Sequence, residues 1–226
     1  MPGGRQVEVV VFDVNETLSD MTAMAARFAE VGADPALART WFAGLLRDGF
    51  ARTVSGTSER FATLGREGLY AALAGAALDR DLDAAVDHIM SGFEGLEVHP
   101  DVPAGMHALR AGGLRQVTLS NGAASVAEGL LGRAGLRDEC EMLLSVEDAK
   151  VWKPAAAAYE YAARQCQVDI AAMLLVAAHP WDVDGAARAG MQTAWIDRTG
   201  GARYPSYFTT PDRTAAGIDD LAAQLT

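Results

Sequence analysis

The sequence predicts an α/β protein: a doubly wound parallel sheet with a helical cap domain inserted after the first strand. Short apolar runs alternate with segments of helical periodicity, which is typical of a parallel sheet covered by helices. The first apolar run, residues 9–12, leads directly into a carboxylate, Asp13. Roughly 75 residues without a strand signal then follow, which predicts the helical insertion.

The first elements of the chain are a buried strand and a series of helices. Residues 9–12, Val-Val-Val-Phe, are an uninterrupted apolar run bounded by polar residues, which is typical of a buried parallel strand. From residue 21 to residue 96 apolar side chains recur at helical spacing, beginning with Met21, Met24 and Phe28. Residues 32–35 and 55–58 are rich in turn formers and separate the helices.

The remaining elements alternate between helix and strand. Residues 99–103 contain two prolines and form a rigid return from the helical segment. The predicted helices after this return are residues 104–111, 125–134, 154–165, 183–189 and 218–225, and the predicted strands are residues 116–119, 141–145, 173–178 and 192–196. Gly190 is the expected stop of the fourth of these helices.

Length and composition limit the domain count and the partners. A chain of 226 residues can form one large core with a small second domain. We expect residues 1–18 and 98–226 to form the core domain and residues 19–97 the cap. Half of the residues are hydrophobic and the mean hydropathy is +0.06, as in ordinary globular proteins. The net charge of −11 argues against broad binding to nucleic acid or to an anionic membrane, but a small anionic substrate is compatible with it.

Cysteine usage and hydropathy indicate the compartment. Cys140 and Cys166 form neither a C-x-x-C pair nor a zinc-type cluster with the four histidines, so we interpret them as buried thiols in a reducing compartment. Residues 1–5 lack a hydrophobic signal core, and no apolar run approaches the roughly 18 residues of a membrane span. The expected location is the cytoplasm. The sequence leaves the oligomeric state open, a homodimer included.

Polar side chains follow four of the predicted strands or lie just beyond them. Asp13 is followed by Asn15 and Thr17 after the first strand, and the other groups are Ser120 with Asn121, Lys153 and Asp182. The carboxyl ends of parallel strands meet at one edge of an open sheet, where the chemistry of such folds is found. We therefore expect these side chains to converge on Asp13.

Together these residues resemble the haloacid dehalogenase (HAD) superfamily of hydrolases, over nearly the whole chain. The resemblance implies a Rossmann-like core, with Asp13 as nucleophile, Ser120 as a substrate-binding hydroxyl, Lys153 as the charge-balancing cation and Asp182 as the carboxylate after the fourth strand. A carboxylate nucleophile divides a difficult displacement into two steps through a covalent intermediate. A nearby ammonium offsets the negative charge gathered at such a site.

Two departures separate this chain from the phosphatases of that superfamily. Those enzymes carry an acid–base Asp at the second position after the nucleophile, where this chain has Asn15. They also carry an acidic residue that helps to hold Mg²⁺ where this chain has Ala178. Mg²⁺ requires oxygen ligands, so both losses argue against phosphoryl transfer and we expect no metal or other cofactor. A phosphatase- or phosphonatase-like hydrolase using Asp13 and Mg²⁺ is the alternative, and a non-catalytic binding protein on the same scaffold is a third.

The closer resemblance is to the type II L-2-haloacid dehalogenases, which need no metal. It rests on Ser120-Asn121-Gly122, on Lys153-Pro154 with the downstream Tyr159, and on Trp181-Asp182 followed by Gly185-Ala186. It implies attack of Asp13 on C2 of a small 2-haloacid, loss of halide, and hydrolysis of the resulting ester by a water that Asp182 activates. By the same resemblance Thr17 and Lys153 orient Asp13, Ser120 holds the substrate carboxylate, and Asn121 and Trp181 lie near the halide.

Several positions depart from the dehalogenase pattern. Asn15 and Glu16 stand where Tyr-Gly is expected, and residues 177–179, Ala-Ala-His, replace a Ser-x-Asn run. Phe42, which follows Trp41, takes the place of a halide-binding Arg, and Arg39 and Arg47 on neighbouring turns are the candidate substitutes. His179 has two interpretations, a proton donor near Asp13 or a neutral histidine beneath the site. We expect Glu16 to be a solvated or helix-capping residue.

Overall fold

The computed structural model describes residues 6–226 and contains one six-stranded sheet. All strand pairs are parallel, in the order β3-β2-β1-β4-β5-β6. The strands are β1 (Val9–Phe12), β2 (Arg115–Ser120), β3 (Met142–Ser145), β4 (Met173–Ala177), β5 (Gln192–Ile196) and β6 (Arg213–Ala215). The predicted doubly wound α/β fold is confirmed. The segment predicted to lack a signal core, residues 1–5, lies outside the described residues.

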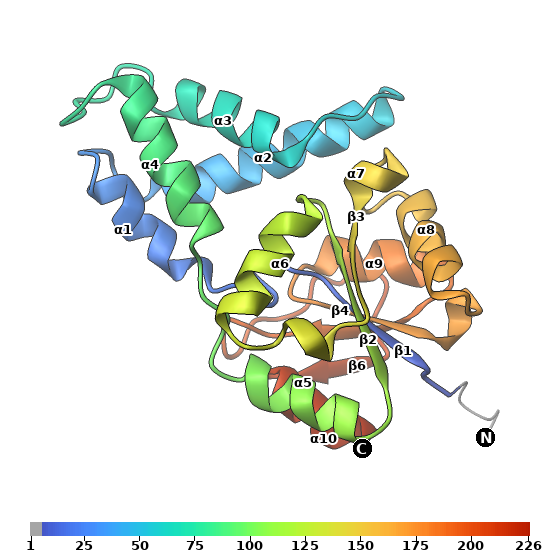
Figure 1. Cartoon of the computed structure of the whole chain (residues 1–226). Helices are drawn as coiled ribbons and strands as arrows, with labels where there is room; N and C mark the ends of the chain where they lie inside the picture. The colour runs from blue at the N-terminus through green and yellow to red at the C-terminus, as the bar shows by residue number, and fades with distance from the viewer. Residues whose placement is uncertain (1–5) are drawn as a thin grey trace.

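Helices cover both faces of this sheet (Figure 1). Side chains alternate along β1, so Val9 and Val11 pack into one apolar cluster with α8 (Ala156–Cys166) and α9 (Pro180–Ala189). Val10 and Phe12 point to the opposite face. There they pack with α5 (Val102–Ala111), α6 (Ala124–Arg133) and α10 (Ile218–Leu225). A strand buried on both faces must be apolar at every position, which explains the run that the sequence shows.

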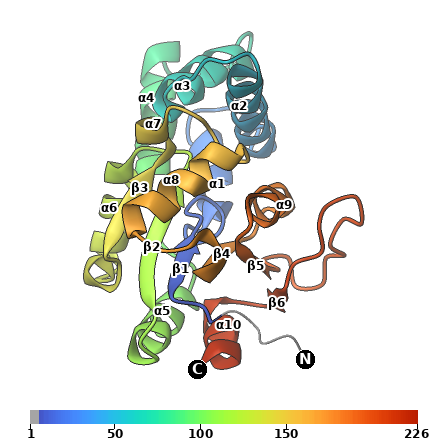
Figure 2. The ribbon, with the colours of Figure 1, turned by 90° about the vertical axis from the view of Figure 1, so that its right-hand side faces the viewer.

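The inserted segment forms a separate helical layer beyond one end of the sheet (Figures 1 and 2). Its helices are α1 (Met24–Ala29), α2 (Leu37–Val54), α3 (Phe61–Ala72) and α4 (Leu82–Glu94), preceded by the 3₁₀ turn η1 (Met21–Ala23). Aromatic rings form its centre: Phe61 stacks on Phe93 with 5.2 Å between ring centroids, and Trp41 Nε1 donates a hydrogen bond of 2.8 Å to the carbonyl of Gly65. We refer to η1 and α1–α4 as the cap.

The chain enters and leaves the cap at one point. The amide of Asp20 donates a hydrogen bond to the carbonyl of Glu97, and the amide of His99 donates one to the carbonyl of Leu18. The two crossings therefore lie side by side at the positions where the sequence analysis divides core from cap. The division into residues 1–18 with 98–226 and residues 19–97 as separate folding units stays a prediction.

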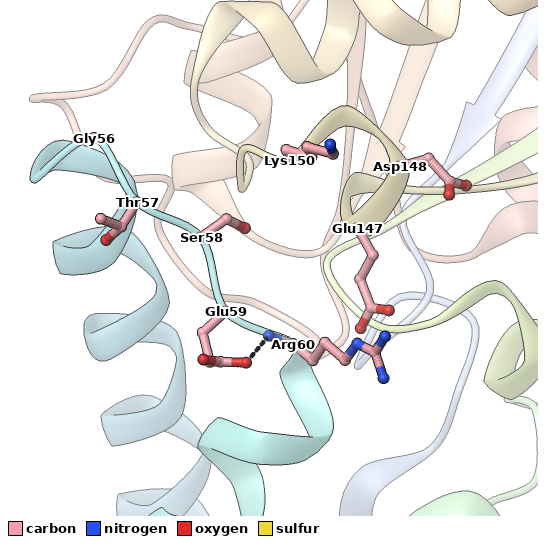
Figure 3. Close-up of a pocket in the computed structure, with 8 residues that line it drawn as sticks. All are labelled: Gly56, Thr57, Ser58, Glu59, Arg60, Glu147, Asp148 and Lys150. Carbon is pink, nitrogen blue, oxygen red and sulfur yellow. Dashed lines mark hydrogen bonds between the residues drawn. The ribbon is translucent and has the colours of Figure 1, made fainter.

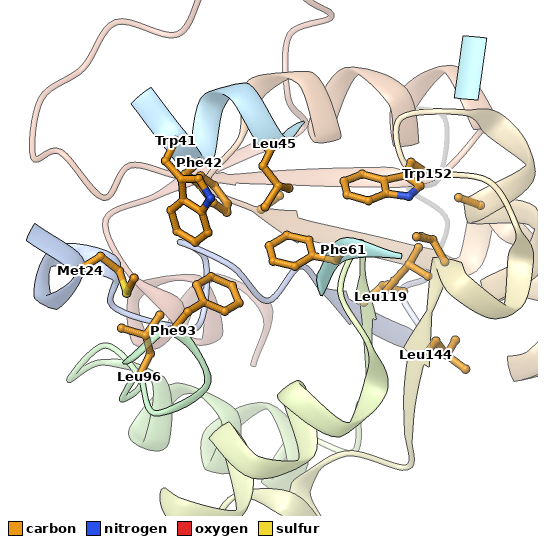
Figure 4. Packing of buried hydrophobic residues seen from close by; sticks show 14 of the residues in the cluster. Met24, Trp41, Phe42, Leu45, Phe61, Phe93, Leu96, Leu119, Leu144 and Trp152 are labelled. Atoms are coloured by element: carbon orange, nitrogen blue, oxygen red, sulfur yellow. The ribbon is translucent and has the colours of Figure 1, made fainter. Parts of the chain in front are cut away.

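Trp152 fixes the core to the cap (Figure 4). Its ring is fully buried and stacks on Phe61 of α3 with 6.0 Å between centroids, and its Nε1 donates to the carbonyl of Glu59 at 2.9 Å. A Cβ added to Gly49 of α2 would lie 2.4 Å from this ring, so only glycine fits there. Because Trp152 directly precedes Lys153, the position of Lys153 is tied to the cap.

The element boundaries differ from the prediction in a few places. α5 and α9 begin earlier than predicted, because proline is well tolerated in the first turn of a helix. Trp181 and Asp182 are therefore helical. The sequence analysis missed α7 (Val146–Ala149), a single turn capped by Ser145, and β6, whose three residues give too short an apolar signal. Two further 3₁₀ turns, η2 (Arg137–Glu139) and η3 (Ile170–Ala172), connect strands and helices. Across residues 6–226 no helix is both long and apolar enough to span a membrane.

Candidate active site

Three charged side chains meet at the carboxyl edge of the sheet. Asp13 follows β1, Asp182 lies in the first turn of α9, and Lys153 lies between α7 and α8. Lys153 Nζ is 2.8 Å from Asp13 Oδ1 and 2.6 Å from Asp182 Oδ2. The Lys153 and Asp182 side chains are fully buried and Asp13 nearly so. One ammonium thus bridges two buried carboxylates. Buried charges are tolerated when they are paired in this way, and loss of one partner would leave a costly unpaired charge in the interior.

The two carboxylates differ in their readiness to take a proton. Burial by itself raises the pKa of Asp13, but the charges and hydrogen bonds of Lys153 and His179 outweigh burial and hold that pKa far below its usual range. At Asp182 burial prevails, assisted by the negative charge of Asp13, so the pKa is raised in spite of Lys153. The pKa values of these two neighbouring carboxylates are shifted in opposite directions, so Asp13 stays ionised and Asp182 takes up a proton more readily. The carboxylates in turn raise the pKa of Lys153 against the effect of burial, so it stays an ammonium.

Thr17 fixes the second oxygen of Asp13. The amide of Ala178 donates to Thr17 Oγ1 at 2.9 Å, so the hydroxyl proton is directed to Asp13 Oδ2, which is 2.7 Å away. Thr17 is fully buried, which holds this geometry in place. The orienting role of Thr17 stays a prediction, which these contacts support.

His179 lies between two carboxylates. Its Nδ1 is 3.2 Å from Asp13 Oδ2, and its Nε2 is 2.8 Å from Glu16 Oε2. Burial lowers the pKa of His179, but hydrogen bonds and charge from Asp13 and Glu16 outweigh it and raise the pKa to about 9. The raised pKa favours an imidazolium at neutral pH, which supports the interpretation of His179 as a proton donor near Asp13. Glu16 is half-exposed, as expected of a solvated residue, and its carboxylate also contacts His179.

Tyr159 holds the other oxygen of Asp182. Tyr159 Oη donates to Asp182 Oδ1 at 2.6 Å, and burial raises the pKa of Tyr159 well above its ordinary value, so the phenol keeps its proton. A Cβ on Gly185 would lie 2.6 Å from this Oη and 2.5 Å from Pro154 Cβ. The glycine three residues after Asp182 is thus required by the close approach of α8 to α9.

The Ser-Asn-Gly turn supports Lys153. Asn121 Oδ1 accepts from the amide of Lys153 at 3.0 Å, and Asn121 Nδ2 donates to the carbonyl of Lys153 at 3.4 Å. Ser120 Oγ accepts from the amide of Gly122 at 2.9 Å and is buried at the end of β2. Both polar atoms of the Asn121 amide are occupied by the Lys153 backbone, which gives Asn121 a positioning task that the sequence analysis did not foresee.

Comparison with known proteins identifies the family. Residues 7–190 match the model of the haloacid dehalogenase-like hydrolases. The chain belongs to this family of hydrolases. It is 29% identical over 219 residues to haloacetate dehalogenase H-2 of Moraxella sp. (strain B), covering 96% of this chain and 97% of that protein. It is 30% identical over 203 residues to (S)-2-haloacid dehalogenase 4A of Burkholderia cepacia, covering 89% of this chain and 87% of that protein.

Solved structures agree with this assignment. L-2-haloacid dehalogenase from Xanthobacter autotrophicus superposes with a TM-score of 0.86 at 25% identity, covering 97% of this chain and 98% of that one. The match spans the inserted cap as well as the sheet. The predicted resemblance to the haloacid dehalogenase superfamily is confirmed.

The cap side of this hydrolase site is aromatic. The ring of Phe42 on α2 lies 6.5 Å from the ring of His179, and the ring of Trp181 lies 5.0 Å from it. Lys153 Nζ is 6.0 Å from the centroid of the Trp181 ring, within the range of a cation–π contact. An apolar wall therefore faces the charged centre at the position where the dehalogenase pattern has an arginine.

The two candidate substitutes for that arginine lie differently. Arg47 is largely exposed and pairs with Asp48 at 2.8 Å. Arg39 lies beside Phe42 on the wall of a cavity of about 220 Å³, which Glu16, His99 and Arg198 also line. Of the two, Arg39 is the one that borders an opening next to the site.

Two other cavities lie apart from this network of contacts. Asn15 is buried and lines a small cavity with Ser19 and Phe93, and no hydrogen bond within residues 6–226 joins its side chain to Asp13. A wider cavity of about 600 Å³ lies between the segment after α2 and α7 (Figure 3). Its lining carries charges of both signs and includes none of the residues predicted for the site: Gly56, Thr57, Ser58, Glu59, Arg60, Glu147, Asp148 and Lys150.

The donor set does not suit a magnesium ion. The ammonium of Lys153 already bridges the facing oxygens of Asp13 and Asp182, and the third position that phosphatases use is occupied by Ala178, which has no ligand atom. Within residues 6–226 no group of three or more His, Cys, Asp or Glu side chains is arranged to hold a metal ion.

Proposed function

We propose that this chain is a metal-independent hydrolase that removes halide from a small L-2-haloacid through an ester on Asp13. The observation that carries the proposal is the position of Lys153 Nζ, which neutralises an ionised Asp13 on one side and contacts a proton-accepting Asp182 on the other. The relatives support the substrate class, since they are named as haloacetate and (S)-2-haloacid dehalogenases.

The first step is a displacement at carbon. Asp13 Oδ1 attacks C2 of the acid, the electron pair of the carbon–halogen bond leaves with the halide, and the configuration at C2 inverts. Ser120 at the end of β2 holds the substrate carboxylate, and the rings of Phe42 and Trp181 enclose the apolar part of the molecule. Holding the nucleophile and the substrate together in the correct orientation accounts for much of the rate enhancement in such a step.

The second step is hydrolysis of the ester. Asp182 takes a proton from a water molecule, which attacks Cγ of Asp13, and the hydroxy acid leaves with its new configuration kept. Tyr159 and Lys153 hold the two oxygens of Asp182 in place for this step. Asn121 holds the backbone of Lys153 in place through a hydrogen bond, and Thr17 orients the carboxylate of Asp13.

The remaining expectations belong to the same proposal. The substrate is a small-molecule carboxylate, and the net charge of −11 argues against nucleic acid or an anionic membrane as partner. We infer a cytoplasmic location from the two buried, free cysteines. A homodimer is compatible with the chain, and light scattering on the purified protein decides it.

The direct test is halide release from L- and D-2-chloropropionate and from fluoroacetate, with EDTA or with added Mg²⁺. We expect release from the L-enantiomer, unaffected by EDTA, and none after Asp13→Asn. A single turnover in H₂¹⁸O should place ¹⁸O in Asp13 rather than in the hydroxy acid, because water attacks Cγ. Absence of halide release together with Mg²⁺-dependent turnover of an aryl phosphate would refute the proposal.

A further inference from the structure

Glu16 has an unusual backbone that brings it to His179. Its φ is +60°, in the left-handed region that glycine favours and other residues rarely adopt. Such strain persists only where surrounding contacts hold it. Here the side chain of Glu16 reaches His179, 163 residues away in the chain, at 2.8 Å. Two departures from the expected dehalogenase pattern, Glu16 and His179, therefore meet in one contact.

The two oxygens of Asp13 are held unequally. Among the described residues, Oδ2 accepts hydrogen bonds from Thr17 and faces Nδ1 of His179, whereas Oδ1 contacts Lys153 Nζ. A carboxylate oxygen has about two lone-pair sites. Both sites of Oδ2 are occupied, whereas Oδ1 keeps one free to attack carbon. Oδ1 thus becomes the ester oxygen and Oδ2 the carbonyl oxygen of the intermediate.

We propose that His179 and Thr17 form the oxyanion hole for hydrolysis of the Asp13 ester, with Glu16 as the residue that positions His179. This inference rests on the proposed function. A fixed donor pair at the atom where charge develops stabilises the transition state more than the ground state. The imidazolium adds a full positive charge that a neutral side chain at this position lacks.

Hydrolysis of the ester proceeds through a tetrahedral intermediate at Cγ of Asp13. The water oxygen bonds to Cγ, the π electrons of the Cγ–Oδ2 bond move to Oδ2, and one water proton passes to Asp182. The electrons then return, the Cγ–Oδ1 bond breaks, and the departing oxygen takes a proton from Lys153 Nζ, which recovers one from Asp182. The second water proton leaves to solvent as the Asp13 carboxylate forms again.

The surroundings of His179 keep it charged. The loop after β1 presents Asp13 and Glu16 to its two ring nitrogens, α2 presents the ring of Phe42, and α9 presents the ring of Trp181. Neither ring titrates, and Lys153 meets Asp13 at its other oxygen. The raised pKa of about 9 follows from the two carboxylates.

The first test separates the two chemical steps. His179→Gln and Glu16→Gln are each mixed with L-2-chloropropionate in a rapid-quench instrument. The halide released in the first turnover is measured with a halide assay. The ester on the Asp13 peptide is measured by mass spectrometry. We expect the first halide release to be undiminished and the ester to accumulate. Its hydrolysis should slow about 100-fold in His179→Gln, the usual effect of one lost oxyanion donor, and roughly tenfold in Glu16→Gln.

A matched pair on the cap surface provides the control. His88 Nε2 lies 2.7 Å from Glu30 Oε2, the same pairing of side chains away from the site. His88→Gln and Glu30→Gln should therefore leave both steps unchanged. Circular dichroism and thermal melting of all four variants establish that each one is folded.

The second test is the pH profile of ester hydrolysis. The active form of His179 is protonated, so wild-type hydrolysis should decline as pH rises through about 9. Glu16→Gln removes one of the two carboxylates that raise this pKa, so its decline should begin at lower pH, whereas Glu30→Gln should not move it. If Glu16→Asp is folded and hydrolyses the ester faster than Glu16→Gln, this recovery would support the role of Glu16 in positioning His179.

Two results would overturn the inference while the proposed function stands. One is slower first-turnover halide release in His179→Gln without accumulation of ester, and the other is an unmoved alkaline decline in Glu16→Gln. If the wild-type chain releases no halide and forms no ester, the proposed function fails and the inference fails with it. The wild-type measurement alone distinguishes these cases.

Discussion

The two sides of Asp13 are built differently. On one side Lys153, Asp182 and Tyr159 are buried, and each polar atom meets a partner within 2.8 Å. On the other side His179 is mostly buried between Asp13 and Glu16, and the Glu16 side chain is 44% exposed. The buried side agrees with the dehalogenase motifs residue by residue, and the open side departs from them. We therefore expect substitutions on the buried side to have the larger effect on activity and stability.

Removal of Lys153 tests the buried side and has the largest expected effect. Lys153→Met leaves two buried carboxylates without a counter-charge, which costs about 3–5 kcal/mol of unfolding free energy. Halide release should become undetectable, because Asp13 loses the cation that keeps it ionised. Urea unfolding and halide assays measure both effects, and Lys150→Met, at an exposed position, is the control. Full activity in Lys153→Met would refute the charge arrangement described here.

Gly185→Ala tests the same side through packing. The new methyl group would lie 2.6 Å from Tyr159 Oη and 2.5 Å from Pro154 Cβ, so α8 and α9 must separate. We expect a loss of about 3 kcal/mol, the upper end for overpacking, and a rate reduced roughly 100-fold as Asp182 is displaced. Gly132→Ala is the matched control, since nothing lies within 4 Å of its Cβ inside α6, and it should stabilise the protein slightly. Equal losses in both variants would contradict the close-approach explanation.

The contrast between the two sides also separates what the sequence predicts from what it does not. Apolar runs determine the strands, and parallel topology brings Asp13, Lys153 and Asp182 to one edge, so the buried side follows from patterns along the chain. The Glu16–His179 contact depends on a positive φ at a non-glycine residue, which no periodicity signals. The contact of Trp152 with the cap was not predicted for a related reason. Its ring is accommodated only because Gly49, on the distant helix α2, has no side chain.

Other contacts and boundaries that the sequence did not predict have the same origin. That Asn121 lies near the halide stays a prediction, but the hydrogen bonds of its amide to the backbone of Lys153 were not foreseen, because a turn motif alone does not reveal the partner of a side chain. The helix predicted over residues 183–189 begins at Pro180 in the structure. The start was predicted too late because a proline that begins a helix and a proline that ends a loop look alike in sequence. Contacts between segments far apart in the chain are therefore the part of this site that the sequence does not predict and the structure reveals.

The pH dependence of stability tests the open side. Because the folded-state pKa of His179 is raised from 6.5 to about 9, its charge stabilises the fold fully below pH 6.5, and this contribution is lost as pH rises through about 9. The unfolding free energy of the wild type minus that of His179→Gln should therefore fall by on the order of 3 kcal/mol between pH 6 and pH 10, because each unit of pKa difference corresponds to about 1.4 kcal/mol. Groups common to both proteins cancel in this difference. A difference that does not change with pH would mean that His179 is neutral.

The smallest expected effect concerns the backbone of Glu16. Glu16→Gln and Glu16→Gly both remove the charge that faces His179, but only glycine relieves the strain of a φ of +60°. The glycine variant should therefore unfold with a free energy about 1 kcal/mol higher than the glutamine variant, while both hydrolyse the ester slowly. Chemical unfolding of the two variants at the same pH measures this difference. If glycine is the less stable of the two, the left-handed backbone at Glu16 is not strained, and the positioning of His179 then rests on the side-chain contact alone.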